Sequence, residues 1–178
     1  MKKSVFLPVI TIAAFAVLLL GLSFGLQGVG KARAESEHLR LLQTLLPDSK
    51  NFTVEEYTGD DANIRSVHKG ENGYVIETVT NGYADDIRML IGVSNKGTVT
   101  GLVVMEMYET FGLGADALTN HRFLAQFLNT SGDTEIGTNV DALSGATVTS
   151  KAINRSILSA VAFVTGADVE SGATSWGE

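Results

Sequence analysis

The sequence predicts an α+β fold: a single N-terminal transmembrane helix, then an antiparallel sheet with helices packed against it. Three observations predict this. Residues 4–30 are apolar and uncharged, β-branched runs separated by turn signals fill the middle of the chain, and a helical spacing of apolar residues returns near the end. Strands followed by helices, rather than alternating with them, are typical of the α+β class. With 178 residues, the chain is long enough for one core.

Composition excludes several classes of function. The net charge of −7 argues against nucleic acid as a partner. The absence of cysteine excludes disulfides, thiol catalysis and cysteine-ligated iron–sulfur clusters within this chain. His38, His68 and His121 lie far apart without the spacing of metal ligands, so we expect solvated surface positions for them and no metal site.

Residues 1–30 are predicted to be a transmembrane anchor. Val5 to Leu26 would rise about 33 Å as a helix, which matches the hydrocarbon thickness of a bilayer. Pro8 falls in the first turns, where proline is tolerated. The alternative is a cleavable signal peptide, for which Ala32-Arg33-Ala34 fits the cleavage site. The apolar run is longer than a signal peptide needs, which favours the anchor, and both interpretations place the remainder outside the cytoplasm.

Residues 31–51 are predicted to form an amphipathic helix that serves as a stalk or packs against the folded domain. Glu35 to Leu46 alternates charged residues with Leu39, Leu42, Leu45 and Leu46, a pattern typical of a short amphipathic helix that ends before Pro47.

Residues 52–166 are predicted to form the folded domain, which opens with strands. Gly70 to Gly73, Asn81-Gly82 and Ser94 to Gly97 are turn signals that separate β-branched and aromatic runs. The predicted strands are Ile64–His68, Tyr74–Thr80, Ile87–Val93 and Thr98–Tyr108.

A helix is predicted over Asp116 to Leu128, and a short strand over Thr134 to Val140. The helix is expected to turn its apolar side chains inward, namely Leu118, Leu124, Phe127 and Leu128.

The last helix is predicted from about Thr149. Thr149 or Ser150 is the expected N-cap, and Gly166 the expected stop before a tail over 167–178. Its inward face is expected to hold the apolar residues that share helical spacing, namely Ile153, Ile157, Ala160, Val161 and Val164.

Thr147 is expected to lie just ahead of this helix. Unpaired backbone N–H groups and the positive end of the helix dipole favour an anion such as phosphate at that place. Gly145 and Ala146 carry almost no side chain, so a bulky group could approach the backbone. Taken alone, these residues are more typical of a capped helix after a tight loop, because Ser, Gly and Thr are common at helix starts in any case.

The ten residues from Asp141 to Ser150 read Asp-x-x-Ser-Gly-Ala-Thr-x-Thr-Ser. This string resembles the flavinylation motif of the FMN-binding domain family, which includes the G subunit of the Rnf electron-transport complex and the C subunit of the sodium-pumping NADH:quinone reductase. The resemblance implies that Thr147 carries covalent FMN through a phosphoester, attached by a separate flavin transferase with FAD as donor. It implies cofactor-binding or recognition roles for the other small and polar residues of the string: Asp141, Ser144, Gly145, Ala146, Thr149 and Ser150.

A second string, Glu109-Thr110-Phe111-Gly112-Leu113-Gly114, resembles the Glu-Thr-Pro-Gly-Leu-Gly segment that precedes the flavinylation motif in the same family. Phe111 stands where the family has proline. The resemblance implies that this segment holds the isoalloxazine ring, with contacts from Glu109, Thr110 and Leu113 and room made by Gly112 and Gly114. The two strings lie in the family's order, and the resemblance covers Gly73 to Val164.

The resemblance implies an electron-transfer subunit of an ion-translocating ferredoxin:NAD oxidoreductase of the Rnf type, anchored by one span in the cell (inner) membrane with its flavin domain outside the cytoplasm. Its partners would be the other subunits, and no complete activity is expected of this chain alone because it lacks a nicotinamide fingerprint. Whether sodium or protons move is left open. A stand-alone flavinylated carrier and a non-redox assembly module of the same fold are the alternatives.

A second Ser-Gly-Ala-Thr ends at Thr174, within the predicted tail. No helical pattern follows it, and Asp168 and Glu170 would repel a phosphate. We therefore expect Thr147 to be the modified threonine, although a transferase that reads only a short string could also act on Thr174.

Overall fold

A computed structural model describes residues 15, 33–108 and 120–167 of the chain. The expected anchor over 1–30, apart from Phe15, lies outside the described residues, as do Glu109–Gly114, Leu118 and the second Ser-Gly-Ala-Thr. Within the described ranges, no helix is long and apolar enough to cross a membrane. The chain divides into two compact units, Met1–Leu41 and Leu42–Glu178. In the first, residues 33–41 are helical, with an ion pair of 3.2 Å between Arg33 Nε and Glu37 Oε1.

The second unit is built on a five-stranded antiparallel sheet whose strand order follows the chain. The antiparallel prediction is confirmed, and the four expected strands lie within one or two residues of their predicted bounds. The strands are β1 (Thr53–Glu55), β2 (Ile64–Lys69), β3 (Gly73–Asn81), β4 (Asp86–Ser94) and β5 (Val99–Met107).

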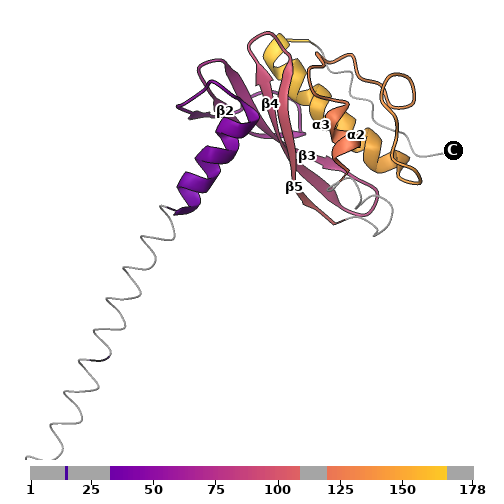
Figure 1. Cartoon of the computed structure of the whole chain (residues 1–178), viewed down its shortest axis with the longest axis horizontal. Helices are drawn as coiled ribbons and strands as arrows, with labels where there is room; N and C mark the ends of the chain where they lie inside the picture. The colour runs from indigo at the N-terminus through magenta and orange to yellow at the C-terminus, as the bar shows by residue number, and fades with distance from the viewer. Residues whose placement is uncertain (1–14, 16–32, 109–119, 168–178) are drawn as a thin grey trace, which may run out of the picture. The chain divides into compact units, whose positions relative to one another are not determined.

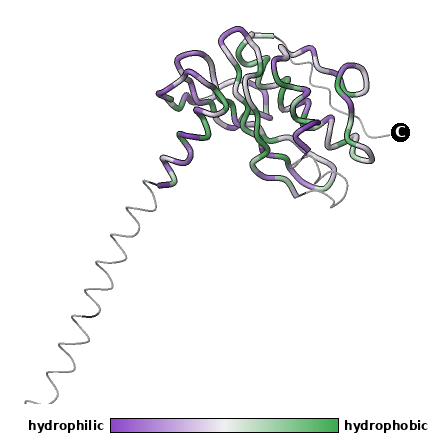
Figure 2. Tube along the Cα trace, in the orientation of Figure 1, coloured by the Kyte–Doolittle hydropathy of each residue, from purple (hydrophilic) through white to green (hydrophobic). Residues whose placement is uncertain are grey.

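Alternation along the strands gives the sheet one strongly apolar face. Ile76 pairs with Ile91, and Ile91 with Leu102, so these side chains share that face. Figure 2 shows apolar and polar residues interspersed along the strands and along the long C-terminal helix. The register is therefore fixed, because a slip of one residue would turn the apolar set to solvent.

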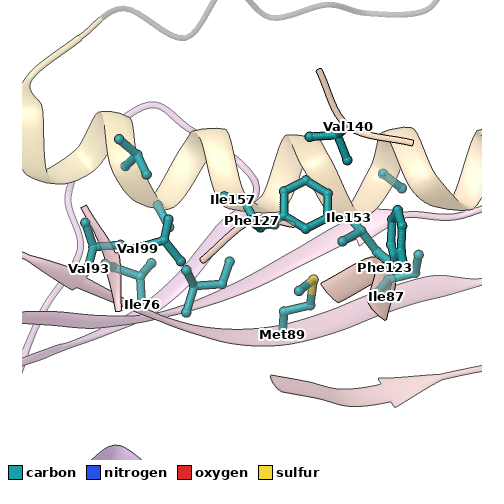
Figure 3. Close-up of a cluster of buried hydrophobic side chains, with 14 of the residues drawn as sticks. Ile76, Ile87, Met89, Val93, Val99, Phe123, Phe127, Val140, Ile153 and Ile157 are labelled. Atoms are coloured by element: carbon teal, nitrogen blue, oxygen red, sulfur yellow. The ribbon is translucent and has the colours of Figure 1, made fainter. Parts of the chain in front are cut away.

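The long helix α3 (Thr147–Thr165) lies along this face, over β3 and β4 (Figure 1). Ile153 and Ile157 are fully buried, and Figure 3 shows them between the helix and the strands. The left-handed backbone of Gly166, with φ of 69°, ends the helix as the sequence predicts.

The opposite face of the sheet receives residues 42–46, which end the helix over 33–45. A Cβ atom on Gly92 would lie 2.1 Å from the carbonyl oxygen of Leu45, so only glycine allows this approach. The Thr100 hydroxyl donates to the same carbonyl at 2.6 Å. Leu42, Leu45 and Leu46 are accordingly buried, as their amphipathic spacing suggests.

Two elements differ from the sequence predictions. In the described part of the expected helix over 116–128, only α2 (His121–Ala125) is helical. Phe123 is buried and Leu128 is 40 % exposed, so the expectation that Leu128 points inward is wrong. The chain leaves the helix after Ala125 and reaches a left-handed residue at Asn129, which turns Leu128 to solvent. The expectation that Phe127 points inward is confirmed, and its ring makes an edge-to-face contact with that of Phe123, at 5.3 Å between centroids.

The predicted strand over Thr134–Val140 is wrong as well. The segment makes a single bridge between Ile136 and Val140 around Gly137, whose φ is 88°. The Asn139 side chain holds this bend by accepting from the Glu135 N–H and donating to the Asp133 carbonyl.

The prediction that His68 is a solvated surface residue is also wrong. His68 lies on β2, and only 9 % of it is exposed.

Candidate functional site

The start of α3 differs from the prediction and defines the site. The helix begins at Thr147, two residues earlier than expected, and Ala146 occupies the N-cap position. Thr149 and Ser150, the expected caps, lie inside the first turn and are 1 % and 0 % exposed. Alanine has no side-chain acceptor, so no side chain caps the helix at Ala146.

Ser150 holds the loop that precedes the helix. Its hydroxyl accepts from the Leu143 N–H at 3.0 Å and donates to the Ala146 carbonyl at 2.9 Å. Between those residues, the Ala146 N–H donates to the Leu143 carbonyl at 3.0 Å, and Gly145 has φ of 73°. This is the backbone that a tight turn with glycine at its third position requires. We call residues 141–146 the Ser-Gly-Ala loop.

Gln126, which the sequence did not single out, holds the beginning of the same loop. Its Oε1 accepts from the Asp141 N–H at 2.9 Å, and its Nε2 lies 3.4 Å from the Asp141 carbonyl oxygen. Val140 and Leu143, on either side, are buried in the core. A spacing of fifteen residues across a loop carries no periodic signal, so the sequence offered no way to find this pair.

Burial divides the predicted site residues into two groups. Asp141, Ser144, Gly145 and Thr147 are exposed, whereas Ala146, Thr149 and Ser150 are buried. Only the first group can meet a large molecule from solution directly. Ser150 therefore acts through the loop that it supports.

The electrostatics at Thr147 favour an anion. The first N–H groups of a helix have no intrahelical acceptor, and they carry the positive end of the helix dipole. The first turn of α3 contains no acidic residue. Lys151 is exposed and stands four residues after Thr147, on the same side of the helix. A phosphate ester on the Thr147 hydroxyl fits this environment.

The ends of β3 and β5 place two aromatic side chains at the end of the domain where α3 begins. The Thr80 hydroxyl donates to the Ala152 carbonyl at 3.2 Å, which ties the first turns of α3 to the end of β3. Ile87 pairs with Met107, so β5 also ends there. Tyr83, after β3, and Tyr108, after β5, are 71 % and 67 % exposed. The structure thus adds two aromatic side chains that the site prediction did not include.

The predicted ring-binding residues belong to the segment between Tyr108 and Asn120. Glu109, Thr110, Gly112, Leu113 and Gly114 lie outside the described residues, so their role stays a prediction.

A cluster of three hydrogen-bonded polar side chains lies on the sheet face away from α3. Glu77 accepts from the Ser66 hydroxyl at 2.6 Å and from Arg88 Nε. Burial raises the pKa of Glu77, but these hydrogen bonds and the Arg88 charge outweigh it and lower the pKa overall. Within the described ranges, no cluster of three or more histidine, aspartate or glutamate side chains could hold a metal ion.

Comparison with known proteins identifies the family. The sequence model of the FMN-binding domain matches residues 82–162. The G subunit of the ion-translocating oxidoreductase complex of Methanosarcina acetivorans is 34 % identical over 177 residues, which cover 90 % of this chain and 93 % of that protein. The G subunit of the Na(+)-translocating ferredoxin:NAD(+) oxidoreductase complex of Acetobacterium woodii is 34 % identical over 94 residues, 48 % of this chain and 45 % of that protein.

A solved structure, the crystal structure of Shewanella oneidensis NqrC, matches with a TM-score of 0.45 and 20 % identity, covering 70 % of this chain and 73 % of that chain. The long match to the Methanosarcina protein confirms the resemblance stated from the two motifs. The chain belongs to the FMN-binding domain family, among the G subunits of the Rnf-type ion-translocating oxidoreductase complexes.

Proposed function

We propose that this chain carries FMN covalently on Thr147 and relays electrons between other subunits of an Rnf-type ferredoxin:NAD oxidoreductase complex. The observation that carries the proposal is the exposed Thr147 at the start of an uncapped helix, presented by a loop whose backbone is held on both sides. When bound, FMN supplies one- and two-electron redox chemistry that no side chain of the chain can perform.

Attachment requires a phosphoryl transfer from FAD. The bond that forms joins Thr147 Oγ to the phosphorus of the flavin half, and the pyrophosphate P–O bond that breaks releases AMP. The hydroxyl proton must pass to a base, because an alcohol is a poor nucleophile otherwise. We assign that base to a separate flavin transferase, with Asp141 and Ser144 as exposed groups for it to recognise.

Several groups of this chain would hold the cofactor. The first N–H groups of α3 would receive the phosphate, with Ser144 beside the turn and Gly145 and Ala146 leaving space. The segment with Glu109, Thr110, Gly112, Leu113 and Gly114 would hold the ring. Covalent attachment would keep the domain loaded outside the cytoplasm, where free FMN is scarce and a dissociable ligand would be lost by mass action.

Membrane attachment belongs to the same proposal. Residues 1–30 would form one transmembrane span and 31–51 the stalk, of which residues 42–46 pack on the sheet. Residues 52–166 would form the FMN-binding domain and 167–178 a tail. The anchor would hold the flavin domain on the outer side of the cell membrane, next to the other subunits of the complex.

Flavin fluorescence on denatured protein tests the proposal. The full chain is co-expressed with a flavin transferase, separated under denaturing conditions and examined for a fluorescent band, together with Thr147→Ala and Thr174→Ala. We expect fluorescence in wild type and Thr174→Ala and none in Thr147→Ala. A dark wild-type band contradicts covalent attachment, and fluorescence lost only in Thr174→Ala assigns the flavin to the second Ser-Gly-Ala-Thr.

A further inference from the structure

The Gln126 side chain bonds to the backbone of two separate segments. Its amide oxygen accepts from the Asp141 N–H at 2.9 Å, and its amide nitrogen lies 3.4 Å from the carbonyl oxygens of both Asp141 and Phe123. A glutamine amide has two N–H donors and one carbonyl acceptor, so these contacts use every N–H donor and the oxygen. Gln126 is therefore held on α2 by one contact and holds the Ser-Gly-Ala loop by two.

The contacts fix the backbone at the first residue of the motif. Both the N–H and the carbonyl of Asp141 are bonded to one rigid amide group, so rotation of the Asp141 backbone would break at least one bond. Ser150 holds the other end of the loop through Leu143 and Ala146. The loop is thus fastened at both ends, whereas the side chains of Asp141, Ser144 and Thr147 are exposed.

We infer that Gln126 is a positioning residue for flavin attachment: it sets the Ser-Gly-Ala loop so that the Thr147 hydroxyl is aligned for phosphoryl transfer. The inference rests on the proposed function. Alignment of reacting groups strongly affects transfer rates, and displacement by about 1 Å can cost roughly 100-fold. Gln126 is also the C-cap residue of α2, so it connects the loop to the end of that helix.

The chain offers a matched control. Gln43 also donates its side-chain amide to a backbone carbonyl, that of Lys50 at 3.2 Å, but it lies in the segment on the opposite face of the sheet. Gln126→Met and Gln43→Met each remove a glutamine-to-backbone contact while nearly preserving side-chain volume. A difference in flavin attachment between the two variants therefore comes from the Ser-Gly-Ala loop, which, of the two glutamines, only Gln126 contacts.

The test uses the full chain in detergent with purified flavin transferase and FAD. Covalent flavin is measured against time over a range of substrate-chain concentrations, and amide hydrogen exchange is measured at Asp141. We expect Gln126→Met to lower kcat about 10-fold with KM changed less than about twofold, because the exposed recognition groups persist while alignment is lost. Exchange at Asp141 should rise, and Gln43→Met should match wild type in both measurements.

Three outcomes overturn the inference. Wild-type kcat in Gln126→Met shows that the contact does not align Thr147. Equal losses in both variants, with equally lowered Tm, show general destabilisation. A wild-type chain that takes up no flavin overturns the proposed function and this inference together, whereas the first two outcomes leave the proposed function standing.

Discussion

Between residues 52 and 166, the two helices that the structure describes begin in opposite ways. At α2, the Asn120 side chain accepts from the Phe123 N–H at 3.0 Å and caps the helix. At α3, Ala146 stands at the equivalent position and no side chain caps the helix. The side chain of Asn120 thus accepts from a first-turn N–H group of α2, whereas no N-cap side chain does so at α3. The FMN phosphate that we propose for this place would supply the acceptor that the N-cap side chain lacks.

The rest of α3 shows why an uncapped start is tolerated. Ile153 and Ile157 are fully buried, and burying such a side chain contributes about 1.5–3 kcal/mol. Polar ties add to this packing: Thr134 donates to Asn154 Oδ1 at 2.6 Å, and Thr80 and Ser156 share a hydrogen bond at 2.8 Å. A missing cap costs only about 1 kcal/mol. Packing therefore determines whether α3 forms, and the domain tolerates the absence of a side-chain cap at its start.

The largest effect should come from the packed part of α3. Ile157→Ala should lower the free energy of unfolding by about 2–5 kcal/mol, because it leaves a cavity between helix and sheet. Denaturant unfolding of the flavin-free chain measures this. If Ile157→Ala lowered the free energy of unfolding by less than removal of the α2 cap in Asn120→Ala, packing would not be what stabilises α3.

Ser150→Ala should have the next largest effect. It removes the acceptor of the buried Leu143 N–H and should destabilise the domain by about 1–3 kcal/mol. Ser144→Ala, on an exposed hydroxyl of the same loop, should stay within about 0.5 kcal/mol of wild type. Equal unfolding free energies for the two variants would contradict the assignment of Ser150 to loop support.

Asn120→Ala tests the capped helix directly. Loss of the acceptor for the Phe123 N–H should lower stability by about 1 kcal/mol. The yield of covalent flavin should match wild type, since Asn120 caps α2 and not α3. Thermal unfolding and in-gel fluorescence measure the two quantities. Unchanged stability would show that the cap contributes nothing to α2.

Ala146→Ser should give the smallest change in stability, of opposite sign. A hydroxyl at the N-cap of α3 should stabilise the flavin-free domain by about 0.5 kcal/mol or more. The same hydroxyl would occupy an N–H group proposed for the phosphate, so flavin attachment should slow. Melting of the flavin-free chain and a flavinylation time course measure these opposite changes. A stabilised variant that is flavinylated at the wild-type rate would contradict an open helix start as part of the site.

The sheet was predictable because its signals are local. Alternating β-branched residues and the turn glycines place β2 to β5 closely, and the two motifs indicated the family. The α3 start was not predictable, because Thr149 and Ser150 look like caps in sequence and only tertiary packing turns them inward. Gln126 was missed for a related reason, since its partner is fifteen residues away across a bend set by Gly137. The Thr134–Val140 strand failed because Asn139 stabilises that bend.

Peptide mass spectrometry of the mature protein from its native membrane tests the central claim most directly. The account predicts that the peptide containing Thr147 carries the added mass of one FMN phosphoryl residue, and that fragmentation places it on that side chain. An unmodified Thr147 peptide from material that is fully active in electron transfer would contradict it.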